Sequence, residues 1–230
     1  MTKIKIAVAG CLGRMGQEIS KQILKNKKLE FVGGLEHTKH KDINKPLNKV
    51  SSIKSSKLVS DNLKEIIKEA NVLIDFTTPK STLDNVRTAS LHKTAVVIGT
   101  TGISDTQKNK VKSFSKKIPI LMSSNMSLGV NLLFSLVEKT ASTLRDIDYD
   151  IEIAETHHKH KKDAPSGTAL SLGEYAAKGR KTNLKKNKVL DRTKKLSSRK
   201  NGNIGFSVTR GGEIAGEHTV SFIGKNDRVD

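Results

Sequence analysis

The sequence predicts an α/β protein with a doubly wound parallel sheet in its N-terminal part and a smaller α+β domain after it. Up to Met122, short apolar runs alternate with stretches of helical periodicity, which is the pattern of repeated strand–helix crossovers. After Asn125 this alternation stops, and strands are no longer separated by single helices. We therefore divide the chain into domains 1–126 and 127–230.

The strands of the first domain are predicted from short apolar runs, which suit strands that are buried on both faces of a sheet. The first run, residues 4–9, ends directly at Gly10. The others are expected at residues 29–35, 72–76, 94–98 and 118–122.

The helices of the first domain are predicted from periodicity and from start signals. Apolar residues recur at helical spacing over 15–24, and a second helix is expected over 61–70. Pro79 is placed at the beginning of a third helix, because proline is tolerated in a first turn. Ser104 and Gln107 have the spacing of a capping box and predict a fourth.

The second domain mixes helices and strands in a different order. Helices are expected over 129–145 and 167–178, and strands over 148–154, 204–210 and 218–223. The chain ends at Asp230, apparently inside a further strand.

The chain is strongly basic, with a formal net charge of +19 over 230 residues. This charge suggests nucleic-acid binding, but only eight of the 42 basic residues are arginine and only eight residues are aromatic. Phosphate forks and stacking platforms are therefore scarce. Residues 178–200 hold eleven basic side chains against one acid, which accounts for +10 of the charge. We interpret this segment as a solvated basic loop and expect no nucleic-acid partner.

The cysteine content and the hydropathy of the chain indicate its cellular compartment. No apolar run is long enough to cross a bilayer, and the N-terminus enters the first strand with no room for a secretory signal. The single cysteine, Cys11, cannot form an internal disulfide. We expect a cytoplasmic protein with no membrane partner.

A glycine-rich turn with the spacing GxxGxxG joins the first strand to the first helix, at Gly10, Gly13 and Gly16. Glycine permits a tight turn there and lets the backbone approach a pyrophosphate, while the helix N-terminus offers free N–H groups. Glu36 ends the second strand, twenty residues after Gly16, where an acidic side chain would hold the hydroxyls of an adenine ribose. The alternative is a structural turn with a solvated glutamate. We favour a Rossmann-like dinucleotide site.

The predicted cofactor is NADH or NADPH. Glu36 favours NADH because a 2′-phosphate would meet its charge, but His37, Lys39 and Lys41 follow closely and could neutralise that phosphate, so dual use is expected. Small polar loops follow three other strands, at the sheet edge where open α/β proteins bind ligands. These loops are residues 75–79, 99–102 and 123–126.

The densest group of reactive side chains lies in residues 155–168, between a predicted strand and a predicted helix. His157 and Lys161 supply titratable protons and positive charge. The helix begins near Gly167 and Thr168, where backbone N–H groups and a hydroxyl can hold a carboxylate.

Two other interpretations of this segment stay open. One is a solvated basic loop. The other is a metal site formed by Glu155, His157, His158 and His160, but their spacing does not match a helical pair of ligands, and no cysteine or second histidine cluster completes a shell. We expect no metal.

The run from Glu155 to Leu170, ETHHKHKKDAPSGTAL, resembles the signature of the 4-hydroxy-tetrahydrodipicolinate reductase (dihydrodipicolinate reductase) family. The resemblance covers essentially the whole chain, because further motifs follow the family in order and spacing. They are residues 10–16, 75–79, 99–102, 123–131, 210 and 216–219.

This resemblance implies a function: NAD(P)H-dependent reduction of 4-hydroxy-2,3,4,5-tetrahydrodipicolinate to tetrahydrodipicolinate in diaminopimelate and lysine biosynthesis. It implies an N-terminal cofactor domain and a second domain that binds the small dicarboxylate substrate and forms a homotetramer. Family members continue beyond the position of Asp230 with a strand and a helix, and we expect both to be absent here. The alternatives are a reductase of another oxo or imino acid, a nucleic-acid-binding protein and a catalytically inactive scaffold.

The resemblance also implies roles for single residues. His157 matches the proton donor/acceptor of the family, and Lys161 matches its proton-donating lysine. Substrate-carboxylate contacts align with His158, Gly167 and Thr168. Cofactor contacts align with Gly10, Cys11, Leu12, Gly13, Arg14, Met15, Glu36, Gly99, Thr100, Thr101, Ser123, Ser124, Asn125 and Met126.

Overall fold

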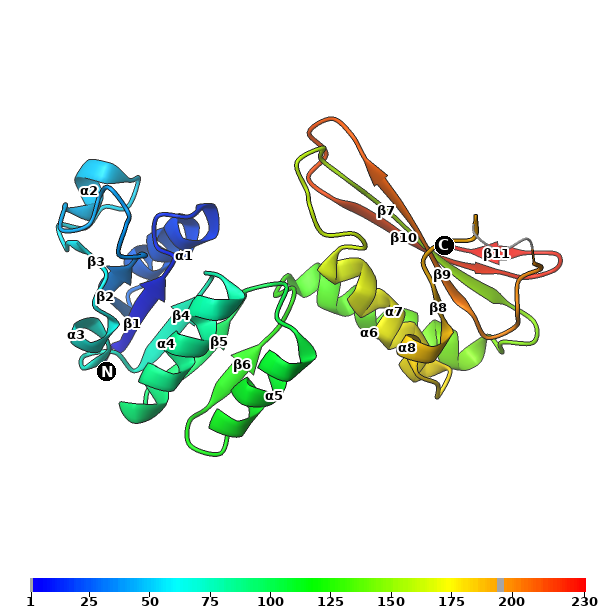
Figure 1. The fold of residues 1–230 in the computed structure, drawn as a ribbon, viewed down its shortest axis with the longest axis horizontal. Coiled ribbons are helices and arrows are strands. Elements are labelled where there is room, and N and C mark those ends of the chain that lie inside the picture. The colour runs from blue at the N-terminus through cyan, green and yellow to red at the C-terminus, as the bar shows by residue number, and fades with distance from the viewer. Residues whose placement is uncertain (1, 194–196) are drawn as a thin grey trace. The chain divides into compact units, whose positions relative to one another are not determined.

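The structure is a computed structural model that describes residues 2–193 and 197–230. The chain forms two compact units, Met1–Ser123 and Ser124–Asp230 (Figure 1), whereas the sequence placed the boundary at residue 126. Residues 194–196 of the basic segment, which we interpreted as part of a solvated loop, lie outside the described residues.

The first unit is built on a six-stranded sheet in the order β3-β2-β1-β4-β5-β6. Each neighbouring pair is parallel, as predicted. The strands are β1 (Ile4–Ala9), β2 (Leu29–Leu35), β3 (Val59–Ser60), β4 (Val72–Asp75), β5 (Ala95–Ile98) and β6 (Ile120–Met122).

Helices cover both faces of this sheet. Along β1, Ile6 and Val8 belong to one core cluster and Ala7 and Ala9 to another, because successive side chains of a strand point to opposite faces. The first cluster includes Ile23 of α1 (Arg14–Lys25). The second takes residues from the other longer helices, which are α3 (Leu63–Ile67), α4 (Pro79–Leu91) and α5 (Asp105–Phe114). The doubly wound prediction is confirmed.

The predicted helix starts are present with their caps. Pro79 occupies the first turn of α4, and the Thr78 side chain accepts a hydrogen bond from the Ser81 backbone N–H. Both hydrogen bonds of the Ser104–Gln107 capping box are formed at the start of α5.

The segment between β2 and β4 holds elements that the sequence did not predict. They are β3 and the short helix α2 (Leu47–Val50), which are too short to show a period. The Glu36 N–H bonds the carbonyl of Ser60, and the Val59 N–H bonds the carbonyl of Lys45, so tertiary hydrogen bonds define this segment.

The second unit has a mixed five-stranded sheet in the order β11-β10-β7-β9-β8. β7 (Asp150–His157) lies in the middle, antiparallel to β10 (Glu217–Ile223) and parallel to β9 (Ile204–Arg210). The edges are β8 (Lys188–Val189) and β11 (Arg228–Val229). The helices are α6 (Leu128–Thr143), α7 (Gly167–Gly179) and α8 (Leu184–Asn187).

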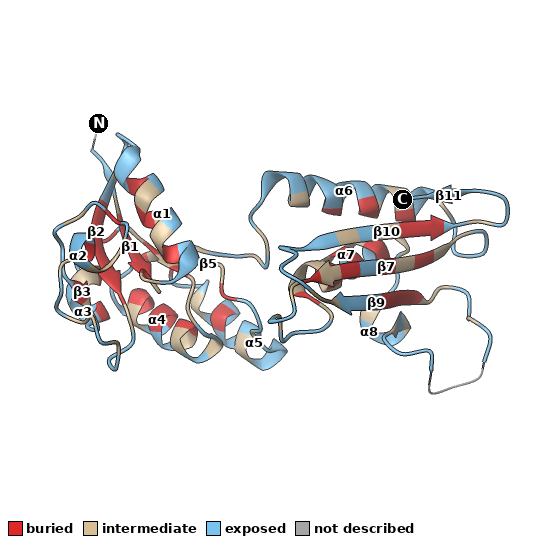
Figure 2. Cartoon of the chain, turned by 90° about the horizontal axis from the view of Figure 1, so that it is seen from above, coloured by how far each residue is buried: buried red, intermediate tan, exposed pale blue. Residues whose placement is uncertain are grey.

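One core joins these helices to the sheet. Phe134 of α6, Leu172 of α7 and Ile153 of β7 are all buried in it, and buried residues line the strands of both sheets in Figure 2. The predicted α+β class of this unit is confirmed.

The predicted end of the middle strand is wrong. The sequence ended it at residue 154 and placed Glu155 in a loop, but β7 continues to His157. Glu155 and His157 are buried and extend the alternation of Ile151 and Ile153, so the strand continues although the side chains become polar.

Within the described part of the chain, none of the helices combines the length and apolar character that a membrane crossing requires.

Candidate active site

The glycine turn after β1 is too tight for side chains. Gly10 has a φ of +75°, and a Cβ there would lie 2.6 Å from the carbonyl oxygen of Phe76. A Cβ on Gly16 would lie 2.0 Å from the carbonyl oxygen of Gly10. The Gly13 N–H bonds that same oxygen at 3.1 Å, and α1 begins at the next residue, Arg14. Glycine therefore lets the turn close tightly just before α1, whose first N–H groups are of the kind that binds anions at a helix start.

Glu36 closes the turn on one side. Its Oε1 accepts a hydrogen bond from the Leu12 backbone N–H at 3.0 Å, which brings the end of β2 to the glycine loop. Cys11 lies beneath it with its side chain fully buried, and burial followed by the charge of Glu36 raises the pKa of the thiol to about 12. The Cys11 N–H bonds the carbonyl of Leu35, which ties the turn to the end of β2.

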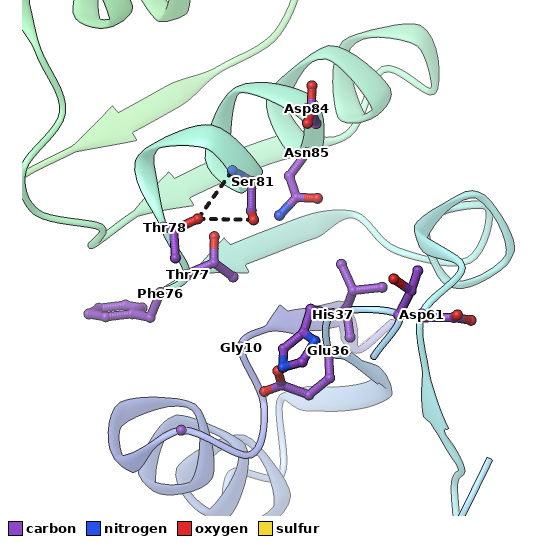
Figure 3. A pocket seen from close by; sticks show the side chains of 13 residues that line it. Gly10, Glu36, His37, Asp61, Phe76, Thr77, Thr78, Ser81, Asp84 and Asn85 are labelled. Atoms are coloured by element: carbon purple, nitrogen blue, oxygen red, sulfur yellow. Dashed lines mark hydrogen bonds between the residues drawn. The ribbon is translucent and has the colours of Figure 1, made fainter. Parts of the chain in front are cut away.

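A pocket of about 440 Å³ opens beside this turn (Figure 3). Glu36 and His37 lie on one side of it, and Thr77 and Asn85 lie across from them. The complete lining is Gly10, Gly13, Leu35, Glu36, His37, Thr38, Asp61, Phe76, Thr77, Thr78, Ser81, Asp84 and Asn85.

A buried carboxylate ties two of the predicted loops together. Oδ1 of Asp75 accepts hydrogen bonds from the Thr77 N–H at 3.0 Å and from the Thr100 hydroxyl at 3.2 Å. Its Oδ2 accepts one from the Asn85 amide at 2.8 Å. The Thr77 N–H also bonds the Thr100 hydroxyl, so a direct hydrogen bond joins the loops after β4 and β5 as well.

The other predicted cofactor residues of this unit lie near the same edge. Gly99 contacts the Phe76 ring so closely that a Cβ would lie 2.1 Å from it. Thr101 is exposed, and the Ser123 N–H bonds the carbonyl of Ile98. Met15 is exposed on α1.

These residues fit a dinucleotide. The glycine cradle and the helix start suit a pyrophosphate, and the Glu36 carboxylate suits ribose hydroxyls. The pocket lining adds two acids that the sequence analysis missed, Asp61 and Asp84. Asp61 follows β3, which was itself not predicted.

In the second unit, three adjacent strands converge on one buried cluster. Glu155 and His157 share a face of β7 because they are two residues apart. The strand register places His218 of β10 opposite Glu155 and Arg210 of β9 opposite His157. Cross-strand neighbours on one face come into contact, and the His157 and His218 rings meet edge to face at 5.1 Å.

Glu155 is the centre of this cluster, with 1% of its side chain exposed. Its Oε1 accepts hydrogen bonds from the Ser166 N–H at 3.0 Å and from Nη2 of Arg210 at 2.9 Å. Its Oε2 lies 2.6 Å from Nδ1 of His157. Burial acts to raise the pKa of Glu155, but the hydrogen bonds from Arg210 and Ser166 outweigh it and hold the pKa below its usual range.

Both histidines favour the neutral form. Burial lowers the pKa of His157, and the charges of Lys161 and Arg210 lower it further against the opposing effect of Glu155. Burial also lowers the pKa of His218, whose Nε2 lies 2.9 Å from the Ser166 hydroxyl. A neutral imidazole at the cluster can accept a proton.

Lys161 lies on the loop that follows β7. Its Nζ donates a hydrogen bond to Oδ1 of Asp163 at 2.8 Å, and 21% of its side chain is exposed. Burial opposes ionisation of Asp163, yet the Lys161 ammonium lowers the pKa of that carboxyl. The His158 N–H bonds the carbonyl of Ile214 and the Lys159 N–H bonds that of Gly212, which hold the loop against the one after β9.

The start of α7 comes directly after the loop that carries Lys161. The Ser166 hydroxyl caps it by accepting a bond from the Ala169 N–H at 3.1 Å. The N–H groups of Gly167 and Thr168 belong to the first turn, which an α-helix leaves without internal partners. The Asn125 amide donates to the Thr168 hydroxyl at 3.3 Å, and Ser124 bonds Ser171 at 2.9 Å. Met126 is exposed.

The structure changes the composition of the possible metal cluster. Glu155, His157 and His218 offer ligand atoms within 4.8 Å of one another, whereas His158 and His160 are not members of that group. Arg210 and the Ser166 N–H already satisfy one oxygen of Glu155.

Sequence reasoning gave no role to three residues of this cluster, namely Arg210, His218 and Ser166. Arg210 and His218 come from strands far away in the chain, so only the register reveals them. A serine directly before a predicted helix signals a cap, and this could have identified Ser166.

Comparisons with known proteins match both units. A family model described as the N-terminus of dihydrodipicolinate reductase matches residues 4–126, and one described as its C-terminus matches residues 129–230. The 4-hydroxy-tetrahydrodipicolinate reductase of Aquifex aeolicus (strain VF5) is 42% identical over 231 residues, which are 99% of this chain and 85% of that protein. The reductase of Polynucleobacter necessarius subsp. necessarius (strain STIR1) is 40% identical over 227 residues, with the same shares.

A solved structure agrees with these relatives. The dipicolinate-bound dihydrodipicolinate reductase from Paenisporosarcina sp. TG-14 superposes with a TM-score of 0.69 at 25% identity. The match covers 99% of this chain and 86% of that one.

Proposed function

This chain belongs to the dihydrodipicolinate reductase family, and we propose that His157 and Lys161 handle the protons of the reaction that this family catalyses. The chain is an NAD(P)H-dependent oxidoreductase of the diaminopimelate and lysine pathway. It reduces 4-hydroxy-2,3,4,5-tetrahydrodipicolinate to tetrahydrodipicolinate.

The chemistry requires one proton source near the substrate ring. Loss of the substrate hydroxyl as water leaves a conjugated imine, and a nicotinamide held by the cofactor site would supply the hydride for ring carbon four. Electron density then moves to the ring nitrogen, where a proton stabilises the developing charge. General acid catalysis of this kind is typically worth about 10²–10⁴-fold.

Lys161 donates that proton in our proposal. Its amino group is only partly exposed and Asp163 holds it at 2.8 Å, so it is oriented. His157 takes up or resets protons beside it, which its neutral, buried imidazole supports. The observation that carries this assignment is that one loop joins a buried histidine to an oriented lysine, directly before a helix start.

The two substrate carboxylates need cationic and N–H partners. We assign one to the start of α7, where Gly167 and Thr168 contribute first-turn N–H groups and a hydroxyl. His158 lies on the same loop and contacts the substrate in this proposal. Basic side chains of the loop raise the local concentration of a dianion.

The cofactor site combines the glycine turn, Glu36 and the loops at the carboxyl edge of the first sheet. We assign cofactor contacts to Gly10, Cys11, Leu12, Gly13, Arg14, Met15, Glu36, Gly99, Thr100, Thr101, Ser123, Ser124, Asn125 and Met126. The fit of the glycine turn supports the first of these, since side chains at Gly10 and Gly16 would clash with backbone.

Two further properties belong to this proposal. We place the enzyme in the cytoplasm, because a reducing compartment suits the free, buried thiol of Cys11. We also propose a homotetramer, as the family resemblance implies.

An assay of nicotinamide oxidation with freshly generated 4-hydroxy-tetrahydrodipicolinate tests the function. The expected result is substrate-dependent loss of nicotinamide absorbance, which should be about 10²-fold slower or more in His157→Asn, as expected for the loss of a general acid–base group. A His157→Asn enzyme with unchanged turnover would remove His157 from the mechanism. A panel of other small dicarboxylates distinguishes this substrate from those of related reductases.

A further inference from the structure

We propose that Glu155 is a positioning residue for His157: its carboxylate keeps the proton of the neutral imidazole on Nδ1 and leaves Nε2 as the nitrogen that exchanges protons. This inference rests on the role given to His157 above. It adds the buried group that selects which nitrogen reacts.

The Glu155 carboxylate is fixed independently of the histidine. Oε1 is held by two donors from different elements, the backbone N–H of Ser166 before α7 and the guanidinium of Arg210 on β9. Oε2 is therefore turned towards the two histidines, with Nδ1 of His157 at 2.6 Å and Nε2 of His218 farther away at 3.9 Å. Both Oε2 and Nδ1 of His157 are buried, and among the described residues neither forms a hydrogen bond with a third group, so the 2.6 Å approach is the close polar contact that each of them makes.

A carboxylate that contacts one ring nitrogen selects the tautomer protonated at that nitrogen. The proton consequently stays on Nδ1, and the lone pair is on Nε2. The same logic applies to histidines in other active sites, where a buried carboxylate orients the ring and stabilises the imidazolium that forms.

The opposite edge of the ring faces Gly216. A Cβ on that residue would lie 2.7 Å from Nε2 and 3.0 Å from Cδ2 of His157, and Gly216 has a φ of +151°. Glycine at this position therefore leaves beside Nε2 the space that a larger residue would fill. His218 packs edge to face against the ring from β10.

The other charges around the ring lower the pKa of His157, and Glu155 is the group that acts to raise it. Lys161 on the following loop and Arg210 on β9 act with burial to lower the pKa of His157. His218 is itself held towards the neutral form. Replacing the Glu155 charge should therefore lower the pKa of His157 further and move the acid limb of the kcat profile to lower pH.

A merely structural ion pair would behave differently. In that case the loss of Glu155 would lower stability, but the tautomer of His157 and the pH profile would stay as they are. Glu152 offers a matched control, because it lies on the same strand and pairs with Arg192 and Arg199, away from His157.

The first test needs no substitution of Glu155. ¹⁵N NMR of the histidine rings in the wild-type chain, with the His157 signals assigned by their loss in His157→Asn, should show a protonated Nδ1 and an unprotonated Nε2 at neutral pH. The opposite tautomer would overturn the proposal, and this readout holds even if Glu155 variants fail to fold.

The second test compares Glu155→Gln with Glu152→Gln. We expect Glu155→Gln to lower kcat at least about tenfold with KM changed by less than about threefold, since partners behind a reacting group typically contribute 10- to 100-fold. The kcat profile should also shift to lower pH, and Glu152→Gln should do neither. Unchanged kcat and tautomer in a folded Glu155→Gln, combined with a large loss in His157→Asn, would refute this inference alone. No loss in His157→Asn would refute the proposed function.

Discussion

Replacing Asp75 by alanine should destabilise the protein by about 3–5 kcal/mol, because this buried carboxylate satisfies donors from two loops and one helix. It accepts from Thr77, through both the N–H and the hydroxyl, and from the side chains of Thr82, Asn85 and Thr100. Some donors keep a second partner, since the Thr82 and Thr100 hydroxyls lie 2.8 Å apart. The Asn85 amide and one hydroxyl would be left without an acceptor, which lowers the free energy of unfolding by about 1–3 kcal/mol each. The small cavity left by the side chain lowers it further.

Urea denaturation followed by circular dichroism measures this loss. Asp75→Asn has nearly the same volume but must turn an amide nitrogen towards a donor, so we expect it to cost about 1–3 kcal/mol. Asp84→Ala is the control. Asp84 is exposed on α4, so this substitution should change the free energy of unfolding by less than about 0.5 kcal/mol. One hydrogen bond contributes about 1 kcal/mol net. If the free energy of unfolding of Asp75→Ala lay within about 1 kcal/mol of the wild-type value, the network would contribute no net stability.

The remaining predictions concern protons and cofactor choice. Lys161→Ala should lower turnover by about two orders of magnitude with NADH affinity little changed, whereas Lys162→Ala, at an exposed neighbouring position, should not; equal turnover in both would contradict the role of Lys161. Burial lowers the pKa values of His157 and His218 below the ordinary 6.5, so the unfolded chain binds more protons than the folded one as the pH falls. The free energy of unfolding should therefore decrease as the pH falls below about 6.5, and His157→Asn should flatten the slope in urea titrations at several pH values; a slope of opposite sign would refute the assignment. NADH and NADPH should bind within about an order of magnitude of each other in calorimetric titrations, because Glu36 and the basic residues after it have opposing effects, and a hundredfold preference would contradict this balance.

Local patterns predicted the elements that have a period or a cap. β2 and β9 have the predicted bounds, and the capping box at Ser104 and the proline at the start of α4 are in place. The elements that were missed are two to four residues long, so they have no period, and hydrogen bonds such as that from Glu36 to Ser60 define them.

The site divides in the same way. Residues of one continuous segment, such as His157 and Lys161, could be predicted because their reactive side chains are close together in the sequence. Arg210 and His218 could not, because they reach Glu155 through pairing of β7 with strands more than fifty residues away. Glu155 itself was visible but was placed in a loop, since a carboxylate does not continue an apolar alternation.

The alternation of side chains along β7 links the pairing register of this strand to the activity of the enzyme. Ile151, Ile153, Glu155 and His157 share one face, so a slip of one residue in the pairing would expose the isoleucines and turn the carboxylate and the imidazole outward at the same time. No misregistered chain can then retain the reaction, and measured activity reports on correct strand pairing as directly as a spectroscopic probe would.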